Sequence, residues 1–175
     1  AESQLEQITI NERERSSLTL EELGDMMESD DNAVKEVIVA GMHRSGTSMV
    51  GNLLKNMGLN MGLEDDLMPG NHYNLFGYFE HLEAVEINND ILNHYGASWI
   101  DVSPFVRNYN VNDIDKVLKF GGEKGGLKLT IGERINHLLR KLRKAEIEVA
   151  IKYPRFCLAL SFWLPFLHNP RLLIC

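Results

Sequence analysis

The feature that most constrains this sequence is a short apolar run that leads directly into a glycine loop and then into a helical pattern. Val37–Ala40 is rich in β-branched residues and predicts a buried strand. Gly41–Ser48 follows as a loop, and apolar residues at helical spacing then continue up to Gly58, which should end the helix. A strand, a glycine loop and a helix in this order begin a βαβ unit. The body of the chain should therefore fold around a parallel sheet.

Two later apolar runs predict further strands of this sheet. Val149–Ile151 reads as a second core strand, and Leu172–Cys175 reads as a third. Residues 156–167, between them, predict a helix. We therefore expect an α/β fold of three layers with a central parallel sheet. Because the chain ends inside an apolar strand, we also expect the carboxyl-terminal part of the domain to be missing.

The segment between the first two strands predicts two helices and a loop. One helix should run from about Phe79 to Tyr95. Thr130 and Glu133 have capping-box spacing and should begin a second, amphipathic helix. Its basic residues are expected on a solvated face: Arg134, Arg140, Lys141, Arg143 and Lys144. Four glycines within residues 121–126 predict a mobile loop.

The acidity of the chain is confined to its beginning. The net charge is −7, and residues 1–36 alone hold 11 acids and 3 bases, a net of −8. The remaining residues hold 14 acids and 15 bases, a net of +1. Residues 1–33 therefore read as an acidic leader with a short helix after Thr19, and residues 34–175 as the folded domain. A nearly neutral body argues against a duplex nucleic-acid partner and suits a small anionic ligand.

Cysteine content and hydropathy indicate a reducing compartment. Two cysteines, Cys157 and Cys175, cannot make a disulfide scaffold, and no amino-terminal apolar run resembles a signal peptide or an anchor. The longest apolar stretch, residues 156–175, is interrupted by prolines and polar residues, so it is too broken to span a bilayer. No spacing of histidines, cysteines and acids suggests a metal site. We expect a cytoplasmic protein without a membrane span or a metal.

The glycine loop has the spacing of a phosphate-binding loop. Gly41 and Gly46 are separated as in Gly-x-x-x-x-Gly, an arrangement that turns backbone N–H groups toward an anion at the amino end of a helix. A Walker A motif would continue with lysine, but Thr47 and Ser48 follow here, and the nearest cation is Arg44. The loop should bind a phosphate-like anion in a P-loop-like fold, yet it is a poor ATPase loop. A tight turn without a ligand is the alternative.

Three segments together resemble the PAPS-dependent sulfotransferases, whose cofactor is 3′-phosphoadenosine-5′-phosphosulfate. The residues Gly-Met-His-Arg-Ser-Gly-Thr-Ser at 41–48 resemble the 5′-phosphosulfate loop of that family. Asn-Leu-Phe-Gly-Tyr-Phe-Glu at 74–80 resembles the Gly-aromatic-aromatic-Glu stretch of its bacterial members. Ile-Lys-Tyr-Pro-Arg at 151–155 resembles their Lys-Asp-Pro-Arg, with Tyr153 in place of the acid. The resemblance covers roughly residues 34–175.

The resemblance implies transfer of a sulfuryl group from PAPS to an acceptor hydroxyl or amine, with PAP as the product and no metal. Fixed cations would then neutralise the charge of the leaving oxygen. The family's 3′-phosphate contacts would lie beyond the end of the chain, because Arg171 does not match their motif position. The implied cofactor-binding residues are those of the loop: His43, Arg44, Ser45, Gly46, Thr47 and Ser48.

Three residues are expected to carry the chemistry that the resemblance implies. Arg44 replaces the family's loop lysine and would stabilise charge on the leaving oxygen. Lys152, at the carboxyl end of a buried strand, resembles the family's strand lysine near the sulfuryl group. Pro154 stands where many members place a histidine base, so Glu80 is the candidate base. We expect Glu80 to begin a helix, with aromatic neighbours that raise the pKa of its carboxyl group.

Other candidates remain open. His43 and His81 are weaker candidates for the base. The chain would alternatively be a non-catalytic nucleotide- or anion-binding module of a larger protein, partnered by other domains. A P-loop small-molecule kinase is the third reading, weakened by Thr47 and by a lysine rather than an acid after the second strand. The acceptor, a small molecule or a glycan, should be bound by residues 59–78 and 96–129.

Overall fold

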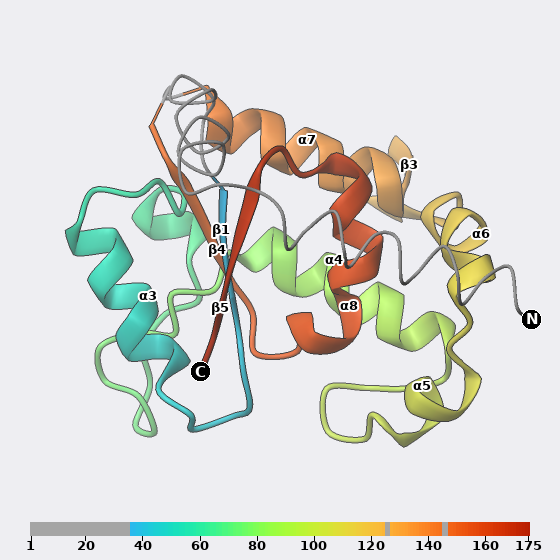
Figure 1. Ribbon diagram of the computed structural model, residues 1–175, viewed down its shortest axis with the longest axis horizontal. Coiled ribbons are helices and arrows are strands. Elements are labelled where there is room, and N and C mark those ends of the chain that lie inside the picture. The colour runs from blue at the N-terminus through green and yellow to red at the C-terminus, as the bar shows by residue number, and fades with distance from the viewer. Residues whose placement is uncertain (1–35, 125–126, 145–146) are drawn as a thin grey trace, which may run out of the picture. The chain divides into compact units, whose positions relative to one another are not determined.

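A three-stranded parallel sheet lies at the centre of the protein. The computed structural model describes residues 36–124, 127–144 and 147–175, and the side chains of residues 122–128 are outside that description (Figure 1). The leader helix predicted after Thr19 falls outside the described residues. The strand order is β4-β1-β5, and both pairs of neighbours are parallel. The three predicted strands are thus confirmed as β1 (Glu36–Ala40), β4 (Val149–Lys152) and β5 (Pro170–Ile174).

Helices cover both faces of the sheet, so the predicted layered α/β architecture is present. Along β1, Val37 and Val39 face a core cluster that includes Leu54 of one helix. Ile38 and Ala40 face the opposite, larger cluster, to which three longer helices contribute most of the helical residues. This alternation follows from the two-residue period of a strand. The first helix is α3 (Thr47–Asn56), and the other three are α4 (Leu82–His94), α7 (Ile131–Arg143) and α8 (Phe156–Trp163).

The apolar pattern that predicts α3 does not match its buried face. Among its residues, Leu54 is buried against the sheet, whereas Met49 and Leu53 are exposed, as is Met57 just beyond its end. Gly51 is buried because the helix approaches the β-carbon of Phe79 so closely that a methyl group there would lie 2.9 Å from it. The helix therefore packs through Thr47, Gly51 and Leu54, with Val50 partly buried against the same cluster.

Shorter elements connect this frame. They are the 3₁₀ turns η1 (Glu64–Asp66), η2 (Val111–Asp113) and η3 (Leu164–Phe166), the helices α5 (Ser103–Asn108) and α6 (Ile114–Leu118), and the strands β2 (Gly121–Lys124) and β3 (Leu127–Thr130). The prediction of a mobile loop at 121–126 is wrong for residues 121–124. These residues pair with β3 in an antiparallel hairpin. Residues 125–126 lie outside the described part.

The amino end of α7 is confirmed in detail, but its basic face is only partly solvated. The Thr130 hydroxyl accepts the N–H of Glu133 at 3.2 Å, and the Glu133 carboxylate accepts the N–H of Thr130 at 2.8 Å. Arg134 is buried and forms ion pairs with two acids of α4, the neighbouring helix. Arg143 is paired with Glu36 of β1. Arg140, Lys141 and Lys144 are exposed as expected.

A search of the helices in the described ranges gives none that is long and apolar enough to cross a bilayer.

Candidate active site

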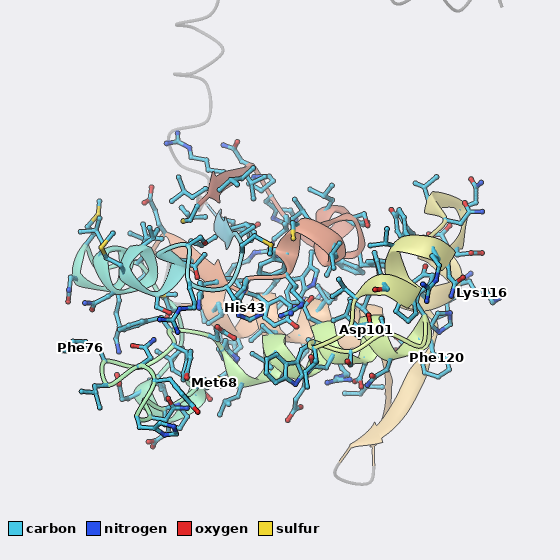
Figure 2. All side chains as sticks on the ribbon, turned by 90° about the horizontal axis from the view of Figure 1, so that it is seen from below. His43, Met68, Phe76, Asp101, Lys116 and Phe120 are labelled. Atoms are coloured by element: carbon cyan, nitrogen blue, oxygen red, sulfur yellow. The ribbon has the colours of Figure 1, made fainter. Side chains whose placement is uncertain are left out.

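A cavity of about 810 Å³ lies at the carboxyl ends of β1 and β4. The loop after β1 and the residues that end β4 line one side of it, and residues 68–78 line another. The two strand ends are held together by backbone hydrogen bonds, from Tyr153 to Val39 at 3.1 Å and from Gly41 to Pro154 at 3.2 Å. Ligands of open α/β sheets bind in this kind of crevice. Figure 2 shows His43 and Met68, two lining residues, from below.

The loop after β1 is shaped by two glycines for different reasons. A β-carbon at Gly41 would lie 2.6 Å from the backbone oxygen of Cys175, so the approach of β5 requires glycine there. Gly46 has a φ of 92°, which favours glycine. Arg44 also adopts a left-handed φ, of 66°, an uncommon conformation for a residue with a β-carbon. The Ser45 hydroxyl closes the turn by donating to the Met42 carbonyl at 2.6 Å.

The amino end of α3 opens into the cavity. Gly46, Thr47 and Ser48 line it, and no described residue accepts a hydrogen bond from their backbone N–H groups. Arg44 also lines the cavity, and its guanidinium group has no hydrogen bond or ion pair with any residue in the described ranges. Unpaired N–H groups at a helix start carry a partial positive charge. This end of the cavity therefore presents positive charge to a ligand.

A buried ion pair joins the end of β4 to the segment before α4. The ammonium group of Lys152 donates to Glu80 Oε1 at 2.6 Å, to the Tyr78 carbonyl at 3.0 Å and to the Ser48 hydroxyl at 3.3 Å. Burial raises the pKa of Glu80 and lowers the pKa of Lys152, while the attraction between them opposes both shifts. Within the described residues nothing bonds to Glu80 Oε2, so one carboxylate oxygen is available to a ligand.

Glu80 is held by its backbone rather than by a helix. The structure corrects the expected helix start, because α4 begins at Leu82 with His81 as its N-cap, and Glu80 precedes both. Phe79 adopts a left-handed φ of 56°, which turns its ring into the core cluster beside α3 and the next residue into the cavity. The Glu80 carbonyl accepts the N–H of Met68 at 2.8 Å. A strained residue beside a buried carboxylate is typical of a functional site.

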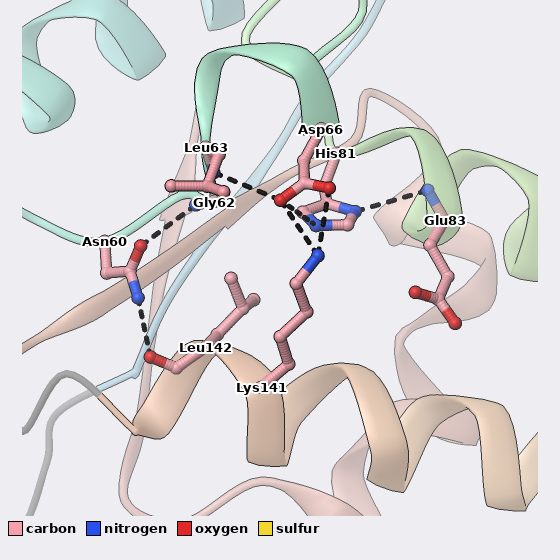
Figure 3. Close-up of polar contacts among 8 residues, drawn as sticks. All are labelled: Asn60, Gly62, Leu63, Asp66, His81, Glu83, Lys141 and Leu142. Carbon is pink, nitrogen blue, oxygen red and sulfur yellow. Dashed lines mark hydrogen bonds and ion pairs between the residues drawn. The ribbon is translucent and has the colours of Figure 1, made fainter.

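His81 does not line the cavity but lies in a cluster of polar residues next to the Glu80 segment. Its Nδ1 accepts the N–H of Glu83 at 3.2 Å, and its Nε2 lies 4.0 Å from Asp66 Oδ2 (Figure 3). Asp66 binds the Lys141 ammonium through both oxygens at 2.9 Å, which lowers the pKa of Asp66. This cluster attaches the segment before Glu80 to α7. His81 is therefore a positioning residue rather than a base.

A third cation, Arg155, lines the cavity from the position just before α8. Arg155 contacts Nε2 of His43, and its guanidinium carbon lies 5.8 Å from the centre of the Trp99 ring. Because arginine can only donate, Nε2 of His43 must accept, so its proton is on Nδ1. Burial lowers the pKa of His43, and the charges of Arg155 and Lys152 lower it further. His43 is therefore neutral when it holds this arginine.

Aromatic and amide side chains form the remaining wall. The Tyr78 hydroxyl donates to Asn71 Oδ1 at 2.8 Å, and the Asn74 amide donates to the Gly77 carbonyl at 2.7 Å. The Tyr153 hydroxyl donates to Oδ1 of Asn89, on α4, at 3.3 Å. Burial raises the pKa of Tyr153 to about 12. These contacts fix the orientation of each side chain toward the cavity.

Most of the residues predicted for the site do meet in one place. Seven of them line the cavity: His43, Arg44, Gly46, Thr47, Ser48, Glu80 and Lys152. Ser45 does not, because its hydroxyl is bonded within the turn. No cluster of three histidines, cysteines or acids suited to a metal ion occurs among the residues with described positions.

Sequence reasoning missed Arg155, Trp99, Asn71 and Asn89 as site residues. Arg155 carried a usable signal, since it lies three positions after Lys152 at the same strand end. Trp99 and the asparagines carried none, because they reach the cavity through tertiary packing. Residues 68–78 and Trp99 do belong to the two segments that were expected to shape an acceptor pocket.

Comparison with known proteins adds no assignment to this geometry. No family model matches the chain, and neither a curated protein nor a solved structure matches it.

Proposed function

We propose that this protein is a PAPS-dependent sulfotransferase with a P-loop-like fold. The observation that carries the proposal is the position of Lys152, whose ammonium group lies 3.3 Å from the hydroxyl of Ser48 in the glycine loop. The loop has Thr47 where a Walker A motif has its lysine, and β4 supplies a lysine to the same end of α3 from elsewhere in the chain. A cytoplasmic location is part of this proposal, since Cys157 and Cys175 are free thiols.

The 5′-phosphosulfate would bind at the amino end of α3. Its oxygens would accept the open N–H groups of Gly46, Thr47 and Ser48, as anions do at helix starts. Arg44 is free to bind two of its oxygens at once, because no described residue engages the guanidinium group. Arg44 and Arg155 place fixed positive charge beside the leaving phosphate, in the role that a metal has in phosphoryl transfer.

Transfer requires one bond to break, one to form and one proton to move. The bond between sulfur and the bridging oxygen breaks, and the phosphate of PAP leaves with the electron pair. The acceptor hydroxyl oxygen forms the new bond to sulfur, and its proton passes to Glu80 Oε2. Burial raises the pKa of Glu80, which makes this carboxylate a stronger proton acceptor than an exposed one. Lys152 keeps Glu80 ionised until the acceptor is bound.

A non-catalytic anion-binding module is the second candidate. The observation that favours it is that Lys152 already donates to three acceptors, one of them the Glu80 carboxylate. A cation satisfied in this way would act as a structural strut beside an anion site. A kinase is less well supported, because Lys152 and Tyr153 stand where the strand end would need an acid for magnesium.

Ligand protection against unfolding separates these candidates. PAP, adenosine 5′-phosphosulfate and ATP with Mg²⁺ should be compared in thermal melts. A ligand at 100 times its Kd adds about 2.7 kcal/mol. At about 2–4 °C per kcal/mol for a domain of this size class, Tm should rise by about 5–11 °C. We expect protection by PAP or by adenosine 5′-phosphosulfate, which does not need 3′-phosphate contacts. Protection by ATP with Mg²⁺ alone would reject the sulfotransferase in favour of the kinase.

Transfer of ³⁵S-labelled sulfate from PAPS to any acceptor decides between enzyme and module. Protection by PAP without transfer to hydroxyl, phenol or amine acceptors would identify a binding module.

A further inference from the structure

We infer that the acceptor is a hydroxyl group of a sugar that carries no positive charge, bound on the aromatic and amide wall of the cavity. This inference rests on the proposed function and names its acceptor class. The wall lines the same cavity as the anion-binding loop and is formed by six residues: Asn71, Tyr73, Asn74, Tyr78, Asn89 and Trp99.

The aromatic members keep exposed ring surface beside their existing contacts. The Arg155 guanidinium carbon lies 5.8 Å from the centre of the Trp99 ring, and the Tyr73 ring lies 3.8 Å from that of His72. Trp99 is 56% exposed and Tyr73 is 77% exposed, although both line the cavity. The face of an aromatic ring carries negative charge density, and the C–H groups on one face of a pyranose ring carry partial positive charge. A sugar ring can therefore lie flat against such a surface. Phe76 is 84% exposed but lies outside the cavity, in the same loop (Figure 2).

The amide members are fixed so that each has a hydrogen-bonding group to spare. Oδ1 of Asn71 accepts from Tyr78, and Oδ1 of Asn89 accepts from Tyr153, which leaves the NH₂ group of each without a partner in the described part. The Asn74 NH₂ donates to a backbone carbonyl, which leaves the Oδ1 of Asn74 able to accept a hydrogen bond from a ligand. A sugar hydroxyl both donates and accepts, so neighbouring hydroxyls match a mixed set of this kind.

Charge and hydration exclude the other acceptor classes that the mechanism allows. Glu80 is the only carboxylate among the lining residues that the structure describes, and Lys152 neutralises it. Arg44 and Arg155 line the same cavity, so an ammonium acceptor would meet repulsion and no counter-charge. A phenol would cover the amides without replacing their bonds to water, which is costly. A polyhydroxyl acceptor carries no positive charge and replaces the bonds of the amides to water.

The test uses Trp99 as its own reporter. The other tryptophan, Trp163, is buried and its indole N–H donates to Asn88 at 2.9 Å, so it should not respond to ligands in the cavity. Neutral methyl glycosides, N-acetylated methyl glycosides, 4-methylphenol and glucosamine are titrated while tryptophan emission is recorded, with PAP present. The same compounds are then offered as acceptors with ³⁵S-labelled PAPS. We expect saturable emission changes and sulfated product with at least one glycoside, and none with glucosamine.

Matched variants locate the binding surface. Trp99→Ala should weaken the apparent affinity for the glycoside at least 10-fold in the transfer assay, because it removes the flat surface. Trp99→Phe keeps such a surface and should restore most of the affinity. Phe76→Ala removes a more exposed aromatic outside the cavity and should change nothing. Protection by PAP should persist in all three variants.

The outcomes test the sugar acceptor and the sulfotransferase function separately. Transfer to 4-methylphenol or glucosamine with no response to any glycoside overturns the sugar acceptor and leaves the sulfotransferase intact. Equal glycoside affinity in Trp99→Ala and the parent also overturns it. Absence of both PAP protection and transfer overturns the sulfotransferase, and the acceptor assignment falls with it.

Discussion

Two buried ion pairs lie at opposite ends of the same sheet, and they have different surroundings. At the amino end of β1, Glu36 accepts from Arg143 at 2.5 Å and from the backbone N–H of His168 at 2.6 Å, and Arg143 also donates to the Phe166 carbonyl at 2.7 Å. At the carboxyl end of β4, Lys152 donates to Glu80 at 2.6 Å. Both glutamates are nearly inaccessible. The second pair lines the cavity described above, and the first pair does not.

The difference shows how location decides what a buried pair does. Both oxygens of Glu36 are bonded to groups of the fold, so that pair ties α7 and the turn before β5 to β1. Glu80 has one oxygen bonded to Lys152 and one with no partner in the described ranges, beside the open end of α3. A buried charge with spare bonding capacity at a cavity indicates chemistry, whereas a saturated one indicates structure.

The largest expected effect comes from Glu80→Gln. The substitution keeps the shape of the side chain but removes its capacity to accept a proton, so turnover should fall by about 10²–10⁴-fold. PAP protection should be unchanged, because the proposed PAP contacts come from the glycine loop. Since burial raises the pKa of Glu80 above its usual 4.5, the acid limb of the pH–rate profile should lie above pH 4.5 and vanish in the variant. Turnover within about threefold of the parent would exclude Glu80 as the base.

Arg143→Met should lower stability and leave turnover unchanged, which is the reverse of the effect expected for Glu80→Gln. It leaves Glu36 buried without its cationic partner, and removal of one partner from a buried pair costs about 3–5 kcal/mol. Arg143 is itself partly exposed, so we expect the lower end of that range, as a shift of the urea midpoint. Turnover per folded molecule should be that of the parent. A loss of turnover that is not explained by the unfolded fraction would contradict the structural role of this pair.

The sequence predicted one of these two pairs better than the other. Lys152 and Glu80 each stood in a segment with a family resemblance, although their contact was not foreseen. Glu80 was expected at a helix start, and the left-handed Phe79 places it ahead of the helix instead. Arg143 was expected on a solvated face because it belongs to a basic run. A basic run does not reveal that Glu36, more than a hundred positions earlier, is buried beside it.

Local signals and tertiary packing account for these results. The three strands, the capping box of Thr130 and the turn at Gly46 depend on residues close together in the chain, and the sequence predicted all of them. The aromatic and amide wall depends on partners that are distant in the chain, and no local pattern indicates it. The hairpin at Gly121 is formed by neighbouring residues, but its glycines resemble those of a loop. Asn71 and Asn89, for example, are ordinary polar residues until Tyr78 and Tyr153 bond to them.

Arg44→Ala should weaken PAP binding by a smaller amount, about 1.5–3 kcal/mol, because it removes a charge-assisted contact at the cavity edge. Isothermal titration with PAP measures the change. The urea midpoint should move little, since the Arg44 side chain contacts no described residue through a polar bond and alanine keeps the β-carbon at this left-handed φ. Arg140→Ala, an exposed arginine on α7, is the matched control. Equal PAP affinity in both variants would show that Arg44 of the glycine loop does not bind the anion.

Tyr153→Phe should have the smallest effect, and its sign should depend on pH. Near pH 7 the variant loses the hydrogen bond to Asn89, worth about 0.5–1.5 kcal/mol. Burial raises the pKa of Tyr153 from 10.0 to about 12, so between these values the folded protein keeps a proton that the unfolded chain releases. The contribution of the neutral phenol is therefore fully present below pH 10 and is lost as pH rises toward 12. The phenylalanine variant lacks this loss, and the urea midpoints of the two proteins should converge or cross above pH 10. Parallel curves from pH 8 to pH 11.5 would show that Tyr153 is not buried as the structure has it, and the carboxyl end of the sheet would then be wetter than its counterpart at Glu36.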